Sequence, residues 1–424
     1  MKRILLALCT AVVLLAGCSK KESGSAAGAA PEGKQNLVIW SFVEDTRRML
    51  KFYESDHPGV TVEFTLASPI SDKLDPVLTS GRGVPDVFAL EIAYVRKYVE
   101  SGQLLDITDV YEKAKDHLVK YQAEIATYNG RVYALSWQAT PGAFYYRRSL
   151  AKQYLGTDDP DTVQTYFTDM NKMMETAGLL ASRSNGTCVI LSGYDALYTP
   201  FKSLRKQPWV VDGKLVIDDA MLRYMDVANQ IRSNGYETRV NSWTEGWYAG
   251  MKGIFQDENG RHVDVFGYFL PTWGLHYVIK ANAEETSGDW AVIKGPLSYY
   301  SGGTWYAAYK NTKNPEAAKE FIRYCTTDDG FLEKWAFQEG DLTSNFVVNE
   351  KIKDQFLDPF VGGQNHYALF AGLASGVDGS LTQGTDEIID GVFGEAVTAY
   401  VLGEKTKDQA VADFKAQING ELGY

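Results

Sequence analysis

Carboxylates, cysteines and tryptophans are the side chains of this chain that could carry chemistry. The 424 residues include 54 Asp and Glu, 9 Trp, 5 His and 4 Cys. Glycoside hydrolysis needs two carboxylates about 5 to 9.5 Å apart, but among so many acids some such pair is inevitable. The adjacent acids at 158–159 and 218–219 stand at expected turns or helix starts, where capping is the simpler interpretation. The carboxylates alone therefore do not indicate an enzyme.

Other catalytic and metal-binding motifs are incomplete in the sequence. It lacks the G-x-S-x-G of a nucleophile elbow. The segments SYYSGG and LTSGRG are glycine-rich turns without the lysine or the spacing of a phosphate loop. The segment DENG (257–260) begins like a calcium-binding loop but lacks several of the ligand positions that such a loop needs. No His stands at metal-ligand spacing from another His or a Cys. We assign no catalytic residue, metal ligand or cofactor.

Cys18 is the cysteine with the clearest chemistry. It follows Lys2, Arg3 and an apolar run (4–15) that has the layout of a signal peptide and is too short to cross a ~30 Å hydrocarbon core. The segment Leu-Ala-Gly-Cys (15–18) resembles the bacterial lipobox, which implies cleavage of residues 1–17 and lipidation of Cys18. Residues 18–36 are then a flexible tether, since they are small, polar and charged. An ordinary secretory signal or a short uncleaved anchor is the alternative.

The composition of the body, residues 37–424, sets its class. It is longer than one hydrophobic core usually supports, so we expect two globular units. The whole mature chain, tether included, has lost Lys2 and Arg3 and keeps 40 of the 42 basic residues against 54 acids, a net charge of −14. This charge argues against nucleic acid or an anionic membrane surface as the partner. The 13% aromatic content suits amphipathic ligands such as sugars, whose C–H faces pack on rings.

The order of the expected elements predicts an α/β sheet that would position a site. Strands LVIW (37–40) and VTVEF (60–64) flank a helix, and the strand PDVFAL (85–90) follows a second helix. In open α/β sheets ligands bind at the carboxyl ends of the strands, which places residues 41–44 and 91–94 at a binding edge. Further along, GTWYAAY is an expected strand, and helices are expected at 315–326, 385–402 and 407–418.

Several segments in register resemble the sugar-binding lipoproteins of ATP-driven (ABC) importers, the extracellular solute-binding proteins related to maltose-binding protein. They are FYESDHPGVTVEF, VLTSGRGVPDVFALE, YVESGQLLDIT, GGTWYAAYKNTKNPEAAKEFIRYCTTDDG and VLGEKTKDQAVADF, after the opening LVIW. The resemblance implies a two-lobed α/β fold of the periplasmic-binding-protein-like type II, with the ligand in the interlobe cleft. It places hinge crossings near 145–147, 296–301 and 346–349. Lobe 1 is then 37–146 plus 299–346, and lobe 2 is 147–298 plus 347–424.

The same resemblance implies which residues contact the ligand, by position only. They are Phe42, Glu44 and Asp45 behind the first strand, Glu91 and Tyr94 behind PDVFAL, Trp137, Gln138 and Thr140 before the first crossing, and Trp273 and Trp305 further on. Leu90 stands where maltose-binding protein aligns a tryptophan, so the stacking ring must come from elsewhere. Burial in a core is the alternative for each Trp, and a surface or capping role is the alternative for the acids.

We therefore expect a receptor anchored by lipid on the extracytoplasmic face of the cell membrane. It would bind a carbohydrate, most simply an oligosaccharide, and deliver it by hinge closure to the transmembrane subunits of an ABC transporter, with a monomeric body. The alternatives are a two-lobed receptor for a polyamine, peptide or anion, and a lipid-anchored glycoside hydrolase. Cys188 and Cys325 fall in different lobes, where a bridge would hinder closure, so we expect two free thiols.

Overall fold

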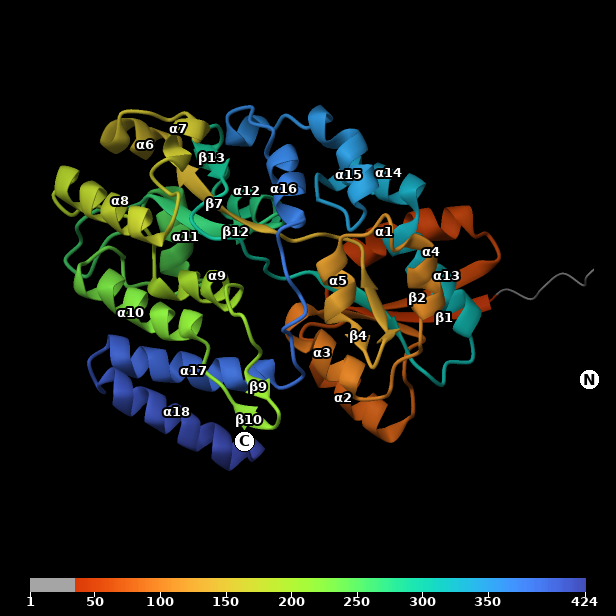
Figure 1. Cartoon of the computed structure of the whole chain (residues 1–424). Helices are drawn as coiled ribbons and strands as arrows, with labels where there is room; N and C mark the ends of the chain where they lie inside the picture. Colours follow the sequence, from red (N-terminus) through yellow and green to blue (C-terminus); the bar gives the residue numbers. More distant parts are fainter. Residues whose placement is uncertain (1–34) are drawn as a thin grey trace, which may run out of the picture.

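The computed structural model describes residues 35–424, so the predicted signal peptide, Cys18 and nearly all of the tether lie outside the described residues. The described chain forms two lobes that lie side by side (Figure 1). One lobe contains a five-stranded sheet and the other a three-stranded sheet. Within residues 35–424 no helix is both long and apolar enough to cross a membrane.

The first lobe is built on the five-stranded sheet, in the order β2-β1-β3-β14-β6. Strands β2, β1 and β3 run parallel, and β14 is antiparallel to both β3 and β6. The chain goes from β1 to β2 on one side and returns to β3 on the other side of β1, so a topological switch point lies between β1 and β3. The strands are β1 (Gln35–Ser41), β2 (Val60–Leu66), β3 (Val87–Glu91), β6 (Ala134–Ser136) and β14 (Thr304–Ala308).

The two faces of this sheet pack against different helices because side chains alternate along each strand. On one face, Val87 and Tyr306 join the first-lobe core with α1 and α13. On the other face, Phe88 and Trp305 join a central cluster that includes residues of α2 and α3. The helices of this lobe are α1 (Asp45–Asp56), α2 (Ser71–Ser80), α3 (Ile92–Glu100), α4 (Thr108–Ala114), α5 (Lys120–Ile125), α13 (Pro315–Thr327) and α14 (Asp329–Glu339).

The second lobe is built on an antiparallel sheet in the order β12-β7-β13. Its central strand β7 (Gly142–Arg147) divides two cores by alternation: Phe144 and Tyr146 join the second-lobe core, while Ala143 and Tyr145 join the central cluster. The chain has thus entered the second sheet by Gly142, slightly before the crossing predicted at 145–147. The outer strands are β12 (Gly267–Pro271) and β13 (Trp290–Ile293).

Most of the remaining helices cover the second lobe, whereas α15 lies beside α14 of the first lobe and α16 lies between the lobes (Figure 1). The helices α17 and α18 pack on each other, and α10 packs on α17. Helix α18 begins with a complete capping box in which Thr406 and Gln409 satisfy each other's backbone N–H groups. The helices are α6 (Arg148–Leu155), α7 (Pro160–Gln164), α8 (Met170–Arg183), α9 (Tyr198–Lys202), α10 (Asp219–Ser233), α11 (Glu245–Lys252), α15 (Phe346–Ile352), α16 (His366–Ala374), α17 (Asp386–Val401) and α18 (Lys407–Leu422).

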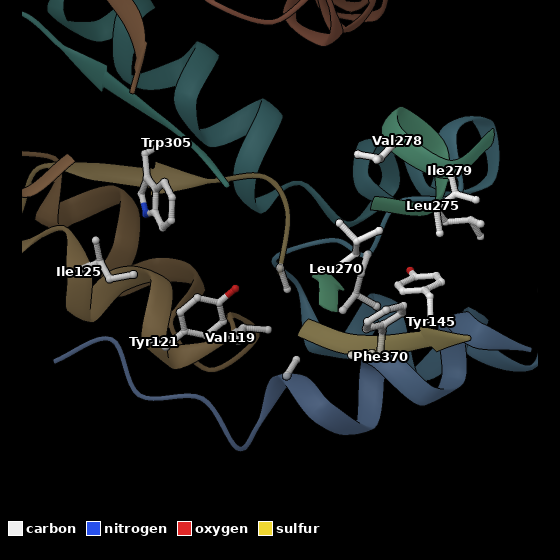
Figure 2. Packing of buried hydrophobic residues seen from close by; sticks show 14 of the residues in the cluster. Val119, Tyr121, Ile125, Tyr145, Leu270, Leu275, Val278, Ile279, Trp305 and Phe370 are labelled. Carbon is white, nitrogen blue, oxygen red and sulfur yellow. The ribbon is translucent and has the colours of Figure 1, made fainter. Parts of the chain in front are cut away.

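The central cluster joins the two lobes. Figure 2 shows Tyr121 and Trp305 of the first lobe on one side, with Leu270, Tyr145 and Phe370 on the other. Buried aromatic and aliphatic groups on both sides mean that the lobes contact each other in this conformation. The two remaining cysteines are free and buried, and they lie in different cores, Cys325 in the first-lobe core and Cys188 in the second-lobe core.

Candidate ligand-binding cleft

A cavity of about 450 Å3 lies where the strands of the first lobe end. The segments after β1, β3 and β6 reach this edge because these strands point the same way, and the antiparallel β14 begins there. The second lobe contributes the segment after β12. The cavity is lined by Phe42, Val43, Glu44, Asp45, Arg48, Glu91, Gln138, Trp273, Tyr277, Gly302, Gly303 and Thr304.

Six of the ten residues predicted to contact a ligand line this cavity. They come from four separate segments of the chain, and only Trp273 comes from the second lobe. They are Phe42, Glu44, Asp45, Glu91, Gln138 and Trp273. The structure therefore places these side chains together, while their contact with a ligand stays a prediction.

Two of the remaining four residues, Trp137 and Trp305, are core residues in this structure. The Trp305 indole is fully buried and its Nε1 donates a hydrogen bond to the carbonyl of Gln122 at 3.0 Å. It packs behind Gly303, since a Cβ on that glycine would lie 2.8 Å from the indole ring. Trp137 is buried in the first-lobe core beside Tyr306, with ring centroids 5.3 Å apart. The expectation that Trp305 faces the cleft does not match this position, because both faces of β14 are buried.

The last two predicted residues also lie outside the cavity wall. Thr140 is buried, and its hydroxyl donates to the carbonyl of Gly302 at 3.0 Å. Tyr94 lies on α3 and packs against the central cluster. Thr140 thus supports the glycine segment of the wall from behind.

Asp45 is the centre of a charged group that crosses between the lobes. Its two carboxylate oxygens accept hydrogen bonds from the Tyr277 hydroxyl at 2.9 and 3.0 Å. Arg48 pairs with Asp45 and with Glu339, the latter at 2.9 Å. Burial raises the pKa of Asp45, and the neighbouring Arg48 guanidinium opposes this effect. Tyr277 belongs to a π-helical turn (Leu275–Ile279) that follows β12, so this hydrogen bond links the two lobes.

Gln138 is held in the wall by a buried carboxyl group. Its Nε2 donates to Oδ2 of Asp341 at 3.0 Å, and the Leu342 N–H donates to the other oxygen at 3.0 Å. Asp341 is buried, and burial together with the negative charge of Asp45 raises its pKa to about 8. The Asp341 carboxyl therefore orients the amide of Gln138 toward a fixed position.

A second, smaller cavity of about 200 Å3 shares Gly302 with the first. Its wall is ionic: Lys202 of α9 pairs with Asp390 and Asp386 of α17, and Arg205 pairs with Asp386 at 3.5 Å. Nη1 of Arg205 and Oδ1 of Asp386 are buried and have no hydrogen-bond partner among residues 35–424. This cavity extends the cleft with polar side chains that the sequence did not identify.

A larger cavity, of about 730 Å3, lies between α5, α15 and α16. It contains none of the predicted residues, and it lies away from the carboxyl ends of β1 and β3. We assign the site to the cavity at the strand ends because polar groups, aromatic rings and both lobes converge there. Within residues 35–424 no group of three or more His, Cys, Asp and Glu could hold a metal ion.

The fold and the cleft together define a two-lobed α/β protein with a ligand cavity between its lobes. The model of the bacterial extracellular solute-binding protein family matches residues 48–356, and the chain belongs to this family. It is 22% identical over 395 residues to the arabinooligosaccharide-binding protein of Bacillus subtilis (strain 168), covering 86% of each chain. It is 23% identical over 393 residues to the lactose-binding protein of Rhizobium radiobacter, covering 88% of this chain and 86% of that protein.

A solved structure with the same fold is the ABC transporter associated binding protein from B. animalis subsp. lactis Bl-04 in complex with beta-1,6-galactobiose. The TM-score is 0.71 at 20% sequence identity, and the match covers 92% of this chain and 98% of that chain. At this identity the likeness shows the fold alone. The relatives named here are binding proteins rather than enzymes.

Proposed function

We propose that this protein is an extracytoplasmic carbohydrate receptor that serves an ABC importer, with an oligosaccharide as its ligand. The observation that carries the proposal is the chemistry of the 450 Å3 cavity, where the rings of Phe42 and Trp273 lie among carboxylates and the Gln138 amide. Sugar C–H faces pack on aromatic rings, while sugar hydroxyls bond to carboxylates and amides. The cavity size is within the ~300 to 1,000 Å3 typical of small-molecule sites.

The relatives support a sugar over the other ligand classes. The two relatives are an arabinooligosaccharide-binding protein and a lactose-binding protein, and the related structure holds beta-1,6-galactobiose. A polyamine, peptide or anion receptor has no comparable support.

The acids of the cavity also support a binding role over hydrolysis. Glu44 pairs with Arg47 at 2.8 Å, Asp45 pairs with Arg48, and Glu91 caps α3 by accepting from the Ala93 N–H at 2.9 Å. Each of these carboxylates is thus engaged in a contact within the protein, and burial raises the pKa values of Asp45 and Glu91. A general acid needs a carboxyl group free to hold and release a proton to the substrate.

Anchoring and delivery complete the proposal. The lipobox-like segment ending at Cys18 would hold the receptor at the membrane, where its closed form meets the transmembrane subunits of the importer. The lobe boundaries at 146–147, 298–299 and 346–347 remain part of this proposal, as does a monomeric body.

A ligand screen tests the proposal directly. Thermal unfolding of the purified protein is measured with arabinooligosaccharides, lactose and galactobiose, and with spermidine and a peptide mixture as controls. A ligand at 1,000 times its Kd stabilises the folded state by ~4 kcal/mol, because it binds only the folded protein. We expect stabilisation by at least one saccharide and recovery of that saccharide unchanged after long incubation. Stabilisation by spermidine or peptide alone, or cleavage of the saccharide, would contradict the proposal.

A further inference from the structure

Trp243 is a large aromatic side chain that stands in solvent beside the cleft. Its side chain is 55% exposed, and it is not part of the cavity wall. Its ring lies 6.0 Å from that of Trp273, with 20° between the planes, and 4.8 Å from that of Trp247. Trp247 is buried and Trp273 is half-buried in the cavity wall. Trp243 therefore lies between a buried indole and an indole of the cavity wall, and it extends the aromatic surface of that wall into solvent.

The backbone at Trp243 is in an unfavourable conformation. Its φ is +69°, and Arg239 in the same loop has a φ of +64°. Left-handed backbone at a bulky residue is a genuine outlier with an energetic cost, and such residues cluster at ligand clamps. Burial of the indole does not offset this cost in full, since about half of the side chain remains in water.

The loop that carries Trp243 is nevertheless firmly held. The N–H of Val240 and the hydroxyl of Thr238 donate to the Ser192 carbonyl at 3.1 and 2.8 Å. The N–H of Ser242, directly before Trp243, donates to the Asp195 carboxylate at 2.9 Å. These three hydrogen bonds hold the backbone that carries the indole in one conformation, and a preorganised ring loses little freedom when a ligand packs on it.

We propose that the exposed side of Trp243 is an outer stacking subsite for a sugar unit of a saccharide whose inner units occupy the cavity. This inference rests on the proposed carbohydrate function. Trp243 stacks beside Trp273 of the cavity wall and keeps an exposed surface, so a saccharide that leaves the cavity at Trp273 can pack a further ring on Trp243. The cavity volume of about 450 Å3 is at the lower end of the usual range, so a longer chain has to leave it. The subsite therefore raises the affinity for saccharides long enough to reach Trp243, while the inner sugar units bind in the cavity.

A length series tests this subsite. Trp243→Gly removes the ring and suits the positive φ, since glycine adopts this conformation without strain; Trp243→Phe keeps an aromatic face. Calorimetry measures Kd for galactose-based and arabinose-based saccharides of two to five units. We expect Trp243→Gly to weaken binding of the longer saccharides by about 10-fold, the loss typical of one well-packed aromatic contact, while Kd for the disaccharide is unchanged. Trp243→Phe should recover most of the affinity for the longer saccharides.

Three other outcomes each have a definite meaning. Equal affinity of the wild type and Trp243→Gly at every length would overturn the subsite and leave the carbohydrate function standing. An equal loss at every length would also overturn it, because the ring would then act only by supporting Trp273. No binding of any saccharide to the wild type would overturn the proposed function and the subsite together. The control Phe337→Ala removes a ring on α14 that is 47% exposed and lies outside the cavity wall, and it should leave every Kd unchanged.

Discussion

Asp341 is a buried carboxyl group directly behind the cavity wall. Asp45 and Glu339 face it with negative charge, and both raise its pKa after the larger effect of burial. Its hydrogen bonds come from Gln138 and the Leu342 N–H, and Arg48 pairs instead with Asp45 and Glu339. Three buried tyrosines, Tyr121, Tyr145 and Tyr367, have raised pKa values to which Asp341 contributes after burial.

This environment predicts that the stability of the protein depends on pH through Asp341, and that a substitution which cannot ionise abolishes this dependence. The pKa of Asp341 rises from 3.8 to about 8 on folding, so the folded state binds the proton more tightly than the unfolded state. Its contribution to stability is complete below pH 3.8 and is lost as pH rises through about 8, at about 1.4 kcal/mol per pH unit. Asp341→Asn cannot ionise, so relative to the wild type it should gain up to about 4 kcal/mol between pH 5 and pH 8.

Urea unfolding of both proteins at pH 5, 6.5 and 8 measures this difference. At pH 5 we expect the variant to be less stable, because an amide replaces one of two oxygen acceptors. A stability difference that stays constant across the three pH values would show that Asp341 is ionised in the folded protein throughout.

At the scale of elements, the two glycines directly before β14 allow the first lobe to contact the second lobe closely. Gly302 and Gly303 have φ values of +69° and +117°. A Cβ on Gly302 would lie 2.7 Å from Nε1 of Trp273, which donates to the neighbouring Ser301 carbonyl at 3.0 Å. Glycine is therefore required here both for backbone conformation and for contact with the second lobe.

Gly302→Ala and Gly83→Ala form a matched pair that separates these two requirements. Gly83 has a φ of +68° but nothing within 4 Å of its Cβ position. Both variants should lose about 1 to 2 kcal/mol of stability from left-handed backbone. Gly302→Ala should lose a further ~1 to 3 kcal/mol from overpacking against Trp273. It should also weaken saccharide binding, because Trp273 has to move. If chemical unfolding shows the same loss of unfolding free energy for both variants, Trp273 moves aside without an energetic cost.

The hydrophobic pattern and the order of the elements along the sequence predict the strands and helices of the first lobe well. The apolar runs at β1, β2 and β3 and the Pro315 start of α13 are visible in the sequence, and chain order alone puts the segments after β1 and β3 at the site edge. The position of Trp305 was not predictable in this way. All five residues of β14 are buried, so no alternation distinguishes a core face from a cleft face.

The residues that the sequence did not identify depend on contacts between distant segments. Arg48 was within reach of sequence reasoning, since it follows Asp45 by three residues on one helix. Tyr277 meets Asp45 only because the lobes come together, 232 residues apart in the chain. Exposure of Trp243 is likewise a property of the folded surface, and nothing in its local sequence indicates it.

For the whole molecule, two contacts near the cavity tie the lobes together in this conformation. The Tyr277 hydroxyl reaches Asp45, and the adjacent His276 ring lies against the end of α14, where a Cβ on Gly340 would be 2.8 Å away. Burial lowers the pKa of His276 to about 4, so this ring is neutral near pH 7 and adds no charge to the interface. A ligand that touches both lobes shifts the population toward such a state in proportion to its extra contacts there.

Removing the Tyr277 hydroxyl should therefore shift the ligand-free protein toward a more open form. A hydrogen bond to a charged group contributes about 1.5 to 3 kcal/mol, and Tyr277→Phe deletes one that spans the lobes. Small-angle X-ray scattering without ligand should give a larger radius of gyration for the variant than for the wild type. A saturating saccharide should restore the compact form at the cost of weaker apparent affinity.

Tyr324→Phe is the matched control for this prediction. The Tyr324 hydroxyl donates to the Asp56 carboxylate at 2.7 Å, and both residues belong to helices of the first lobe. Tyr324→Phe removes a tyrosine–carboxylate hydrogen bond of the same kind but leaves the contact between the lobes intact. The radius of gyration and the saccharide Kd should therefore stay at wild-type values. If Tyr277→Phe weakens binding but leaves the ligand-free dimensions unchanged, Tyr277 acts on the saccharide itself and not on the equilibrium between open and closed lobes.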